Sequence, residues 1–245
     1  MPRRRTVLLV VSELGRRLRD VLGRDLVGVY LGGSFVMDDF IDATSDYDVL
    51  VLIRRPLTAS RVAALRRMHD QLVRARRDAA RLDGDYVPAP WLVPTGTRRP
   101  VHFFRRGRLR ARPEFMLSAD NVANIREDGI AVVGPPAKRV LPPVKPDQVR
   151  AAARAMLHER ASLRTEAAAA EEILGALRSM SAIETGKPTS KTDGVRWGLA
   201  HLDRKWHPLI RGADAVRRGR PKGTTDLLGQ AAALTRSLKA LDRAR

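Results

Sequence analysis

The sequence predicts an α+β protein in which a mixed sheet with flanking helices is followed by a helical bundle. Three observations support this fold class. Strand-like and helical segments alternate between residues 26 and 133, whereas beyond Asp147 the chain is rich in alanine and poor in strand-like runs. Between the two parts, residues 142–146 read Pro-Pro-Val-Lys-Pro, which is typical of a linker. We therefore expect one domain at residues 1–144 and a second at residues 145–245.

The spacing of apolar residues predicts the elements of the first domain. Residues 6–22 place Val7, Val11, Leu14 and Leu18 on one face of a helix. The runs 26–31 and 47–53 are apolar on both faces, which is typical of strands buried within a sheet. The other expected elements are a helix at 61–81, a strand at 82–92, a short apolar segment at 100–104, a helix at 115–127 and a strand at 129–136, with the Arg-rich run 105–112 as an exposed loop.

Four helices are expected in the second domain, at residues 147–165, 166–184, 191–202 and 225–241. Thr185-Gly186 ends one of them, and Pro188-Thr189-Ser190 precedes the next. Helices joined by such short connections pack as a bundle or half-bundle.

Two carboxylates stand at the front of the second strand. Asp46 and Asp48 are separated by one residue, so both side chains leave the strand on the same face, roughly 6.5 Å apart along the chain. Two like charges at this distance disfavour each other's ionised form unless a cation lies between them. Mg²⁺ prefers oxygen ligands and commonly binds one or two carboxylates together with phosphate groups. The pair therefore predicts a magnesium site.

A glycine turn precedes this pair in the chain. Gly32-Gly33-Ser34 follows the first strand, and backbone N–H groups and a hydroxyl in such a concave turn suit phosphate oxygens. The turn and the carboxylates together predict a site for a metal-bound nucleotide.

The combined pattern resembles a known superfamily. Gly33-Ser34, eleven residues, and then Asp46-x-Asp48 entering an apolar strand is similar to the Gly-Ser…Asp-x-Asp signature of polymerase-β-like nucleotidyltransferases. The resemblance implies that residues 1–144 form a nucleotidyltransferase catalytic domain. It also implies that Asp46 and Asp48 bind Mg²⁺, with ATP as the co-substrate bound in part by Gly33 and Ser34.

A third carboxylate is expected to act as the general base. Asp83 and Asp85 lie on the next strand and share one face, so spacing alone does not choose between them. Either could accept the proton of an attacking hydroxyl group. In the resembling family the base is an acidic residue that follows a leucine, and Leu82-Asp83 matches that position, with Asp where Glu is more usual.

The second domain carries a further resemblance. Residues 173–191, followed by Trp197, are similar to the C-terminal helical domain of streptomycin/spectinomycin 3''-adenylyltransferases. Arg178 and Lys191 match the two basic residues that bind the nucleotide phosphates in that family. Lys191 also stands in the first turn of a helix, where the helix dipole disfavours a cation, and a phosphate partner would explain its position. The resemblance implies that residues 145–245 complete the nucleotide and acceptor sites.

The composition and the N-terminal segment indicate where in the cell the protein is expected. Cysteine is absent, which excludes disulfides and thiolate metal sites and fits a reducing cytoplasm. The apolar stretch after the basic start is interrupted by Ser12-Glu13, so we expect an amphipathic helix with no secretory signal and no membrane span. A cytoplasmic location is therefore expected.

The net charge of +19 leaves two explanations open. It favours nucleic acid as a partner, but 39 of the 46 basic residues are arginine, spread along the chain as GC-rich coding would also produce. The expected function is Mg²⁺-dependent transfer of AMP from ATP to a hydroxyl of an aminoglycoside-like amino-sugar compound, with release of pyrophosphate. The alternatives are a nucleotidyltransferase fold that acts on or binds RNA, or one that modifies a protein partner.

Overall fold

A computed structural model gives the three-dimensional structure, and it describes residues 2–92, 99–115, 118–159 and 163–244. The chain divides into two compact units, Met1–Pro143 and Val144–Arg245. Each unit is described below by itself.

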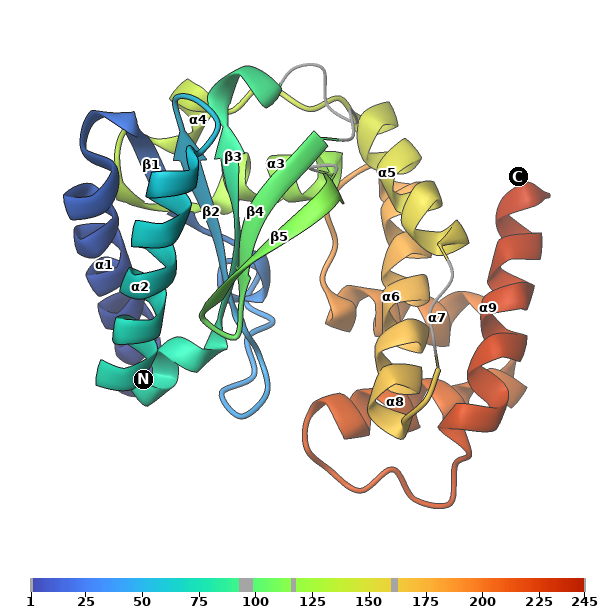
Figure 1. Cartoon of the computed structure of the whole chain (residues 1–245). Helices are drawn as coiled ribbons and strands as arrows, with labels where there is room; N and C mark the ends of the chain where they lie inside the picture. Colours follow the sequence, from blue (N-terminus) through green and yellow to red (C-terminus); the bar gives the residue numbers. More distant parts are fainter. Residues whose placement is uncertain (1, 93–98, 116–117, 160–162, 245) are drawn as a thin grey trace. The chain divides into compact units, whose positions relative to one another are not determined.

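The first unit is built on a six-stranded mixed sheet (Figure 1), with the strand order β5-β4-β3-β2-β1-β6. Its strands are β1 (Leu26–Leu31), β2 (Tyr47–Ile53), β3 (Leu82–Pro88), β4 (Arg99–Arg105), β5 (Arg108–Phe115) and β6 (Ile130–Val133). Of these neighbours, β2 and β3 run parallel and the other pairs are antiparallel. The helix that connects β2 to β3 allows this parallel pairing.

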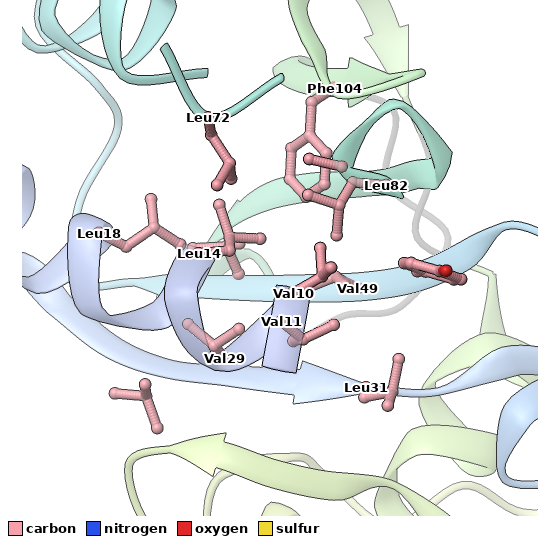
Figure 2. Packing of buried hydrophobic residues seen from close by; sticks show 14 of the residues in the cluster. Val10, Val11, Leu14, Leu18, Val29, Leu31, Val49, Leu72, Leu82 and Phe104 are labelled. Atoms are coloured by element: carbon pink, nitrogen blue, oxygen red, sulfur yellow. The ribbon is translucent and has the colours of Figure 1, made fainter. Parts of the chain in front are cut away.

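Two helices, α1 (Pro2–Leu22) and α2 (Ala59–Ala75), pack together and cover one face of the sheet. Figure 2 shows Val11 and Leu14 of α1 facing Val29 of β1 and Val49 of β2. These side chains belong to one buried apolar cluster that also includes Leu82. Because alternate residues of a strand point to opposite faces, the other residues of β2 and β3 face away from the two helices.

The other two α-helices of the first unit that the structure describes lie on either side of β6 in the chain. They are α3 (Ala119–Asp128), which precedes β6, and α4 (Ala137–Val140), which follows it. Apolar side chains of α3, including Val122 and Ile125, are buried. The Gly129 amide donates a hydrogen bond to the Ile125 carbonyl at the end of α3, directly before β6.

Several predicted boundaries in the first unit are wrong. The helix expected at 61–81 ends at Ala75, because Arg76 is extended and a separate 3-10 turn spans Arg77–Arg81. The run 105–112 was expected to be a loop, but its residues 108–112 belong to β5. Leu109 of this strand is buried, and the arginines on either side of it are exposed. The helix expected at 115–127 begins at Ala119, and residues 116 and 117 lie outside the described residues.

The second unit is helical, as predicted (Figure 1). It contains α5 (Pro146–His158), α6 (Glu166–Thr185), α7 (Lys191–His201), α8 (His207–Arg217) and α9 (Leu227–Arg243). The central helix, α6, packs against each of the other four. Helix α8 was not predicted from the sequence. The helix expected at 147–165 ends earlier, at His158, and residues 160–162 lie outside the described residues.

The predicted fold class is confirmed: a mixed sheet with flanking helices precedes a helical part. Among the helices that the structure describes, none has the length and apolar character needed to cross a membrane.

Candidate active site

The predicted metal ligands lie on the sheet face that points away from α1 and α2. Tyr47 and Val49 of β2 are buried in the core against these helices, so Asp48, between them, points to the opposite face. Asp46 stands two residues earlier, directly before the strand. Both aspartates are exposed to solvent, as a site that receives a ligand requires.

The candidate base lies on the neighbouring parallel strand. Asp83 of β3 is the register partner of Asp48, whereas Asp85 is the partner of Leu50, one step further into the sheet. Residues in register on adjacent strands share a face. Asp83 is therefore the acid of β3 that stands beside the Asp48 position, and Asp85 lies beside a buried leucine.

Asp83 also has a cationic neighbour. The guanidinium Nε of Arg105, on β4, lies 3.3 Å from Asp83 Oδ2. The Arg105 side chain is 64% exposed, so this ion pair is screened by solvent and contributes little to stability. Such a pair can open when a substrate enters.

The glycine turn lies directly against Asp48. Gly33 has a φ of +63°, a left-handed conformation that favours glycine. A Cβ atom built on Gly33 would overlap the Asp48 carboxylate, with Oδ2 as its nearest atom. Any larger residue at position 33 would therefore displace the predicted metal ligand. The turn and the carboxylate, fifteen residues apart in the chain, form one site.

The two glycine amides of this turn are already engaged within the protein. The N–H of Gly32 donates to the Asp48 carbonyl at 2.9 Å, and the N–H of Gly33 donates to Asn124 Oδ1 at 2.8 Å. The expectation that these amides bind phosphate is therefore not met in this structure. Ser34 follows Gly33 in the 3-10 turn and is partly exposed.

Asn124 is a residue of this site that the sequence analysis did not find. It lies on α3 and is 5% exposed. Because the Gly33 N–H is a donor, the Asn124 side-chain oxygen, and not its nitrogen, faces Gly33. The hydrogen bond joins residues 91 positions apart in the chain, so no local sequence pattern predicts it.

The donor set fits a magnesium ion that also binds phosphate. The structure contains two exposed carboxylates at i and i+2, and Mg²⁺ sites of this kind use one or two carboxylates plus substrate oxygens. Among the described residues, no group of three or more His, Cys, Asp or Glu side chains is placed to hold a metal by itself.

The second unit brings the two predicted phosphate-binding cations to one helix crossing. Arg178 lies on α6, and Lys191 is the first residue of α7. A Cβ atom on Gly194 would lie 2.6 Å from the backbone N of Arg178, so α7 crosses α6 closely at this point. Thr189 Oγ1 also donates to the Arg178 carbonyl at 3.0 Å. These contacts fix the backbones that carry both cations.

The start of α7 is capped in a way that leaves Lys191 in its first turn. Ser190 and Asp193 form a reciprocal capping box, in which the Ser190 hydroxyl accepts from the Asp193 amide. Burial raises the pKa of Asp193, but hydrogen bonds from Ser190 and the nearby Arg196 outweigh it, and its pKa is lowered overall. The carboxylate is thus kept ionised at the helix N-terminus, where a negative charge is stabilising.

In this structure the two cations interact with protein groups. The Lys191 ammonium pairs with the carboxylate of Glu171 on α6, and the Glu171 side chain is 57% exposed. Arg178 Nη2 lies 3.8 Å from the Met156 sulfur. An exposed pair of this kind is worth about 0–1 kcal/mol, so a phosphate could replace Glu171.

Two comparisons with known proteins found similarities. Residues 139–240 match the family model described as the aminoglycoside adenylyltransferase C-terminal domain. A crystal structure of the spectinomycin adenyltransferase AAD(9) from Enterococcus faecialis with ATP and spectinomycin superposes with a TM-score of 0.74 at 18% identity, covering 94% of this chain and 98% of that chain.

No curated protein sequence matches the chain significantly. The structural match at this identity establishes the shared fold, and the family model identifies the C-terminal unit. Together they show that residues 139–240 are similar to this C-terminal domain and that the chain shares the fold of the spectinomycin enzyme.

Proposed function

We propose that this protein transfers AMP from ATP to a hydroxyl group of an amino-sugar antibiotic and releases pyrophosphate, in a reaction that requires Mg²⁺. The observation that carries the proposal is the grouping of Asp48 with its register partner Asp83, next to Asp46 and the Gly33 turn. The register places Asp48 and Asp83 side by side on neighbouring strands, Asp46 directly precedes β2, and the Gly33 turn lies against the Asp48 carboxylate.

Asp83 is assigned as the general base. It takes the proton from the acceptor hydroxyl while that oxygen forms a bond to the α-phosphorus of ATP. The bond between the α-phosphorus and the oxygen bridging to the β-phosphorus breaks, and pyrophosphate leaves with its electron pair. General-base help of this kind contributes roughly 10²- to 10⁴-fold. Asp85 stays the alternative base, although its position beside Leu50 makes it less suited.

Asp46 and Asp48 would hold the magnesium ion. When bound, Mg²⁺ neutralises charge on the phosphate oxygens and helps to orient them. The protein's part is to present the two carboxylates to solvent, and Gly33 leaves the space in which the Asp48 carboxylate sits. The Ser34 hydroxyl would donate to an outer phosphate.

Arg178 and Lys191 would bind the phosphates from the second unit. Because both cations belong to one rigid crossing of α6 and α7, they would act together. Lys191 would exchange Glu171 for a phosphate oxygen, which carries more charge.

The proposed acceptor rests on the similarity of residues 139–240 to the aminoglycoside adenylyltransferase C-terminal domain and on the shared fold. Aminoglycoside adenylyltransferases are named for a small amino-sugar acceptor, and the structurally similar enzyme was crystallised with ATP and spectinomycin. RNA and protein acceptors rest on net charge and on the shared catalytic core alone, and the comparisons lend them no support. A spectinomycin-like compound is therefore the first acceptor to test.

The experiment measures pyrophosphate release from ATP with a panel of amino-sugar antibiotics, with and without Mg²⁺. We expect release that depends on one panel member and on Mg²⁺. Asp46→Asn and Asp48→Asn should each lower it by about 10²-fold or more, because loss of a ligand should cost at least as much as loss of a supporting residue.

Asp20→Asn is the matched control. Asp20 is an exposed aspartate of the same unit that pairs with Arg16 on α1, and we expect its variant to retain wild-type activity. The function proposed here is wrong if no panel member stimulates release, or if the Asp46 and Asp48 variants stay as active as the Asp20 variant.

A further inference from the structure

Arg81 makes an unusual set of contacts at the edge of the candidate active site. Its guanidinium donates from Nε to the Ser45 carbonyl at 3.0 Å and from Nη1 to the Asp42 carbonyl at 2.9 Å, and Nη2 also donates to Ser45. The same group lies 4.8 Å from the centre of the Tyr47 ring and 5.6 Å from that of Phe40. One side chain thus contacts three residues of the loop before β2 and the first residue of β2.

The loop that Arg81 contacts ends at the predicted metal ligands. Its own hydrogen bonds close it tightly: the amides of Thr44 and Ser45 donate to the Ile41 carbonyl, and the Ile41 amide donates to Ser45 Oγ. Ser45 directly precedes Asp46 in the chain. The position of the Ser45 carbonyl therefore sets the backbone from which the Asp46 side chain leaves.

Arg81 also precedes the strand that carries the candidate base. It is the last residue of the 3-10 turn before β3, two positions before Asp83. Because β2 and β3 are parallel and in register, the guanidinium links the entrance of one strand to the entrance of the other. Its contacts join residues 36 and 39 positions apart in the sequence.

We propose that Arg81 is a positioning residue for the magnesium site, which holds the Asp42–Ser45 loop so that Asp46 and Asp48 face a common ligand beside Asp83. This inference rests on the proposed function, because it concerns the same carboxylates. Arg81 touches neither the nucleotide nor the reacting atoms; it acts through the loop backbone.

The geometry requires arginine at this position. A planar fork can donate to two carbonyl groups while its face lies on an aromatic ring, whereas a lysine ammonium is a compact point charge without a fork. Arg81→Lys would keep the charge and lose the paired donors. Arg81→Gln would keep a planar donor group and lose the charge.

Arg77→Lys is the matched control. Arg77 lies in the same 3-10 turn and is exposed, so its replacement changes composition and charge in the same way. Circular dichroism and the thermal midpoint would verify that each variant is folded before the other measurements.

Two measurements test the proposal without any transfer reaction. Hydrogen exchange of a peptide covering residues 40–47 should be about tenfold faster in Arg81→Lys, because the loop amides lose their support. Mn²⁺ binding, followed by electron paramagnetic resonance with a non-hydrolysable ATP analogue, should be weaker by about 10- to 100-fold, the usual effect of losing a residue that supports a metal ligand. Arg81→Gln should lie between Arg81→Lys and wild type, and Arg77→Lys should match wild type.

A third measurement separates positioning from catalysis. In the transfer assay the Mg²⁺ concentration for half-maximal activity should rise about tenfold in Arg81→Lys, while kcat at saturating Mg²⁺ stays within about threefold of wild type. A general loss of folded protein would instead lower kcat without changing the Mg²⁺ requirement.

Different outcomes would overturn the role proposed for Arg81 and the proposed AMP-transfer function. Faster exchange with unchanged Mn²⁺ affinity would reduce Arg81 to a structural contact and overturn the proposal, as would exchange identical to wild type. Faster exchange and weaker Mn²⁺ binding in a protein that transfers AMP to no acceptor would uphold the proposal and overturn the function. A wild-type protein that binds no Mn²⁺ would overturn both.

Discussion

His69 shows how one buried side chain couples the stability of this protein to pH. It lies on α2 with no exposed surface, and its Nε2 is 2.7 Å from the Tyr86 hydroxyl on β3. Burial lowers the pKa of His69 from 6.5 to about 4, although a backbone group of Gly107 and the charge of Asp70 raise it in part. The folded state therefore keeps the imidazole neutral.

The sign of the pH effect follows from this shift. The unfolded chain takes up a proton at His69 near pH 6.5, whereas the folded protein does so only near pH 4. The free energy of unfolding should therefore decrease as the pH falls from about 6.5 to 4, by on the order of 3 kcal/mol from this residue, at 1.36 kcal/mol per pKa unit. Urea denaturation at pH 7.5, 5.5 and 4.5 would measure it.

His69→Gln provides the control, because glutamine can still hydrogen bond to Tyr86 and does not titrate. Other groups contribute equally to both proteins, so the difference between their pH profiles isolates His69. A wild-type profile parallel to that of His69→Gln between pH 6.5 and 4 would contradict the assigned shift.

At the residue scale, the sequence revealed the candidate metal ligands and missed residues that contact their surroundings. Asp46 and Asp48 were found because a pair of acids at the front of an apolar strand breaks the local pattern. Asn124 and Arg81 were not found, because their partners are 91 and 36 positions away. Arg81 was also one of 39 arginines, and only its contacts distinguish it.

At the element scale, the crossing of α6 and α7 depends on glycine. A Cβ atom on Gly194 would lie 2.6 Å from the Arg178 backbone N, and one on Gly198 would lie 2.7 Å from the Leu177 side chain. Gly194→Ala should therefore push the helices apart and lower the free energy of unfolding by about 1–3 kcal/mol. It should also weaken ATP binding, because Arg178 and Lys191 move with their helices.

Gly175→Ala is the matched control in the same helix pair. Gly175 lies in the interior of α6, and a Cβ atom there would meet nothing within 4 Å. Its replacement should stabilise the protein by about 0.5–1 kcal/mol, since glycine is a poor helix former. Chemical denaturation of the two variants compares them. Equal effects of the two substitutions would mean that the close crossing does not exist in solution.

The pair between Lys191 and Glu171 gives a second prediction at this scale. If Lys191 binds phosphate, Glu171 competes with the nucleotide for the same ammonium group. Glu171→Gln should therefore tighten ATP binding by about two- to fivefold, which corresponds to an exposed ion pair of less than 1 kcal/mol. Isothermal titration with ATP would measure it.

Glu166→Gln is the control for this change. Glu166 is the first residue of α6 and pairs with Lys222 at 3.1 Å, so its removal changes the net charge equally without freeing Lys191. The same increase in affinity for both variants would show that net charge, and not Lys191, sets ATP binding.

The elements that the sequence mispredicted share a physical cause. In β5, Leu109 is buried between the exposed Arg108 and Arg110, but the density of charge suggested a solvated loop. In α8, Leu209, Ile210 and Ala213 are buried at helical spacing, yet the segment is short and follows Pro208 closely. In both cases burial against neighbouring elements, which composition does not reveal, decides the structure.

At the scale of the whole molecule, the charge of +19 is divided almost evenly. The first unit has 26 basic and 16 acidic residues, a net charge of +10, and the second has 20 and 11, a net charge of +9. An even division favours a compositional origin of the charge over a single nucleic-acid-binding surface. It still creates a positive potential around both units.

This potential predicts opposite salt effects on the two substrates. A cationic amino-sugar is repelled at long range and ATP is attracted, and the screening length shortens from about 30 Å at 0.01 M salt to about 8 Å at 0.15 M. Raising KCl over this range should therefore increase kcat/KM for the acceptor several-fold and decrease kcat/KM for ATP. An uncharged, N-acetylated acceptor should show little change, which separates long-range charge from effects of salt on folding.

An RNA acceptor would instead behave as ATP does, and more steeply, with log K falling by about 0.7 per phosphate contacted for each log unit of salt. The sign of the acceptor's salt dependence thus distinguishes a cationic small molecule from a polyanionic RNA, two of the three acceptor classes that the sequence left open.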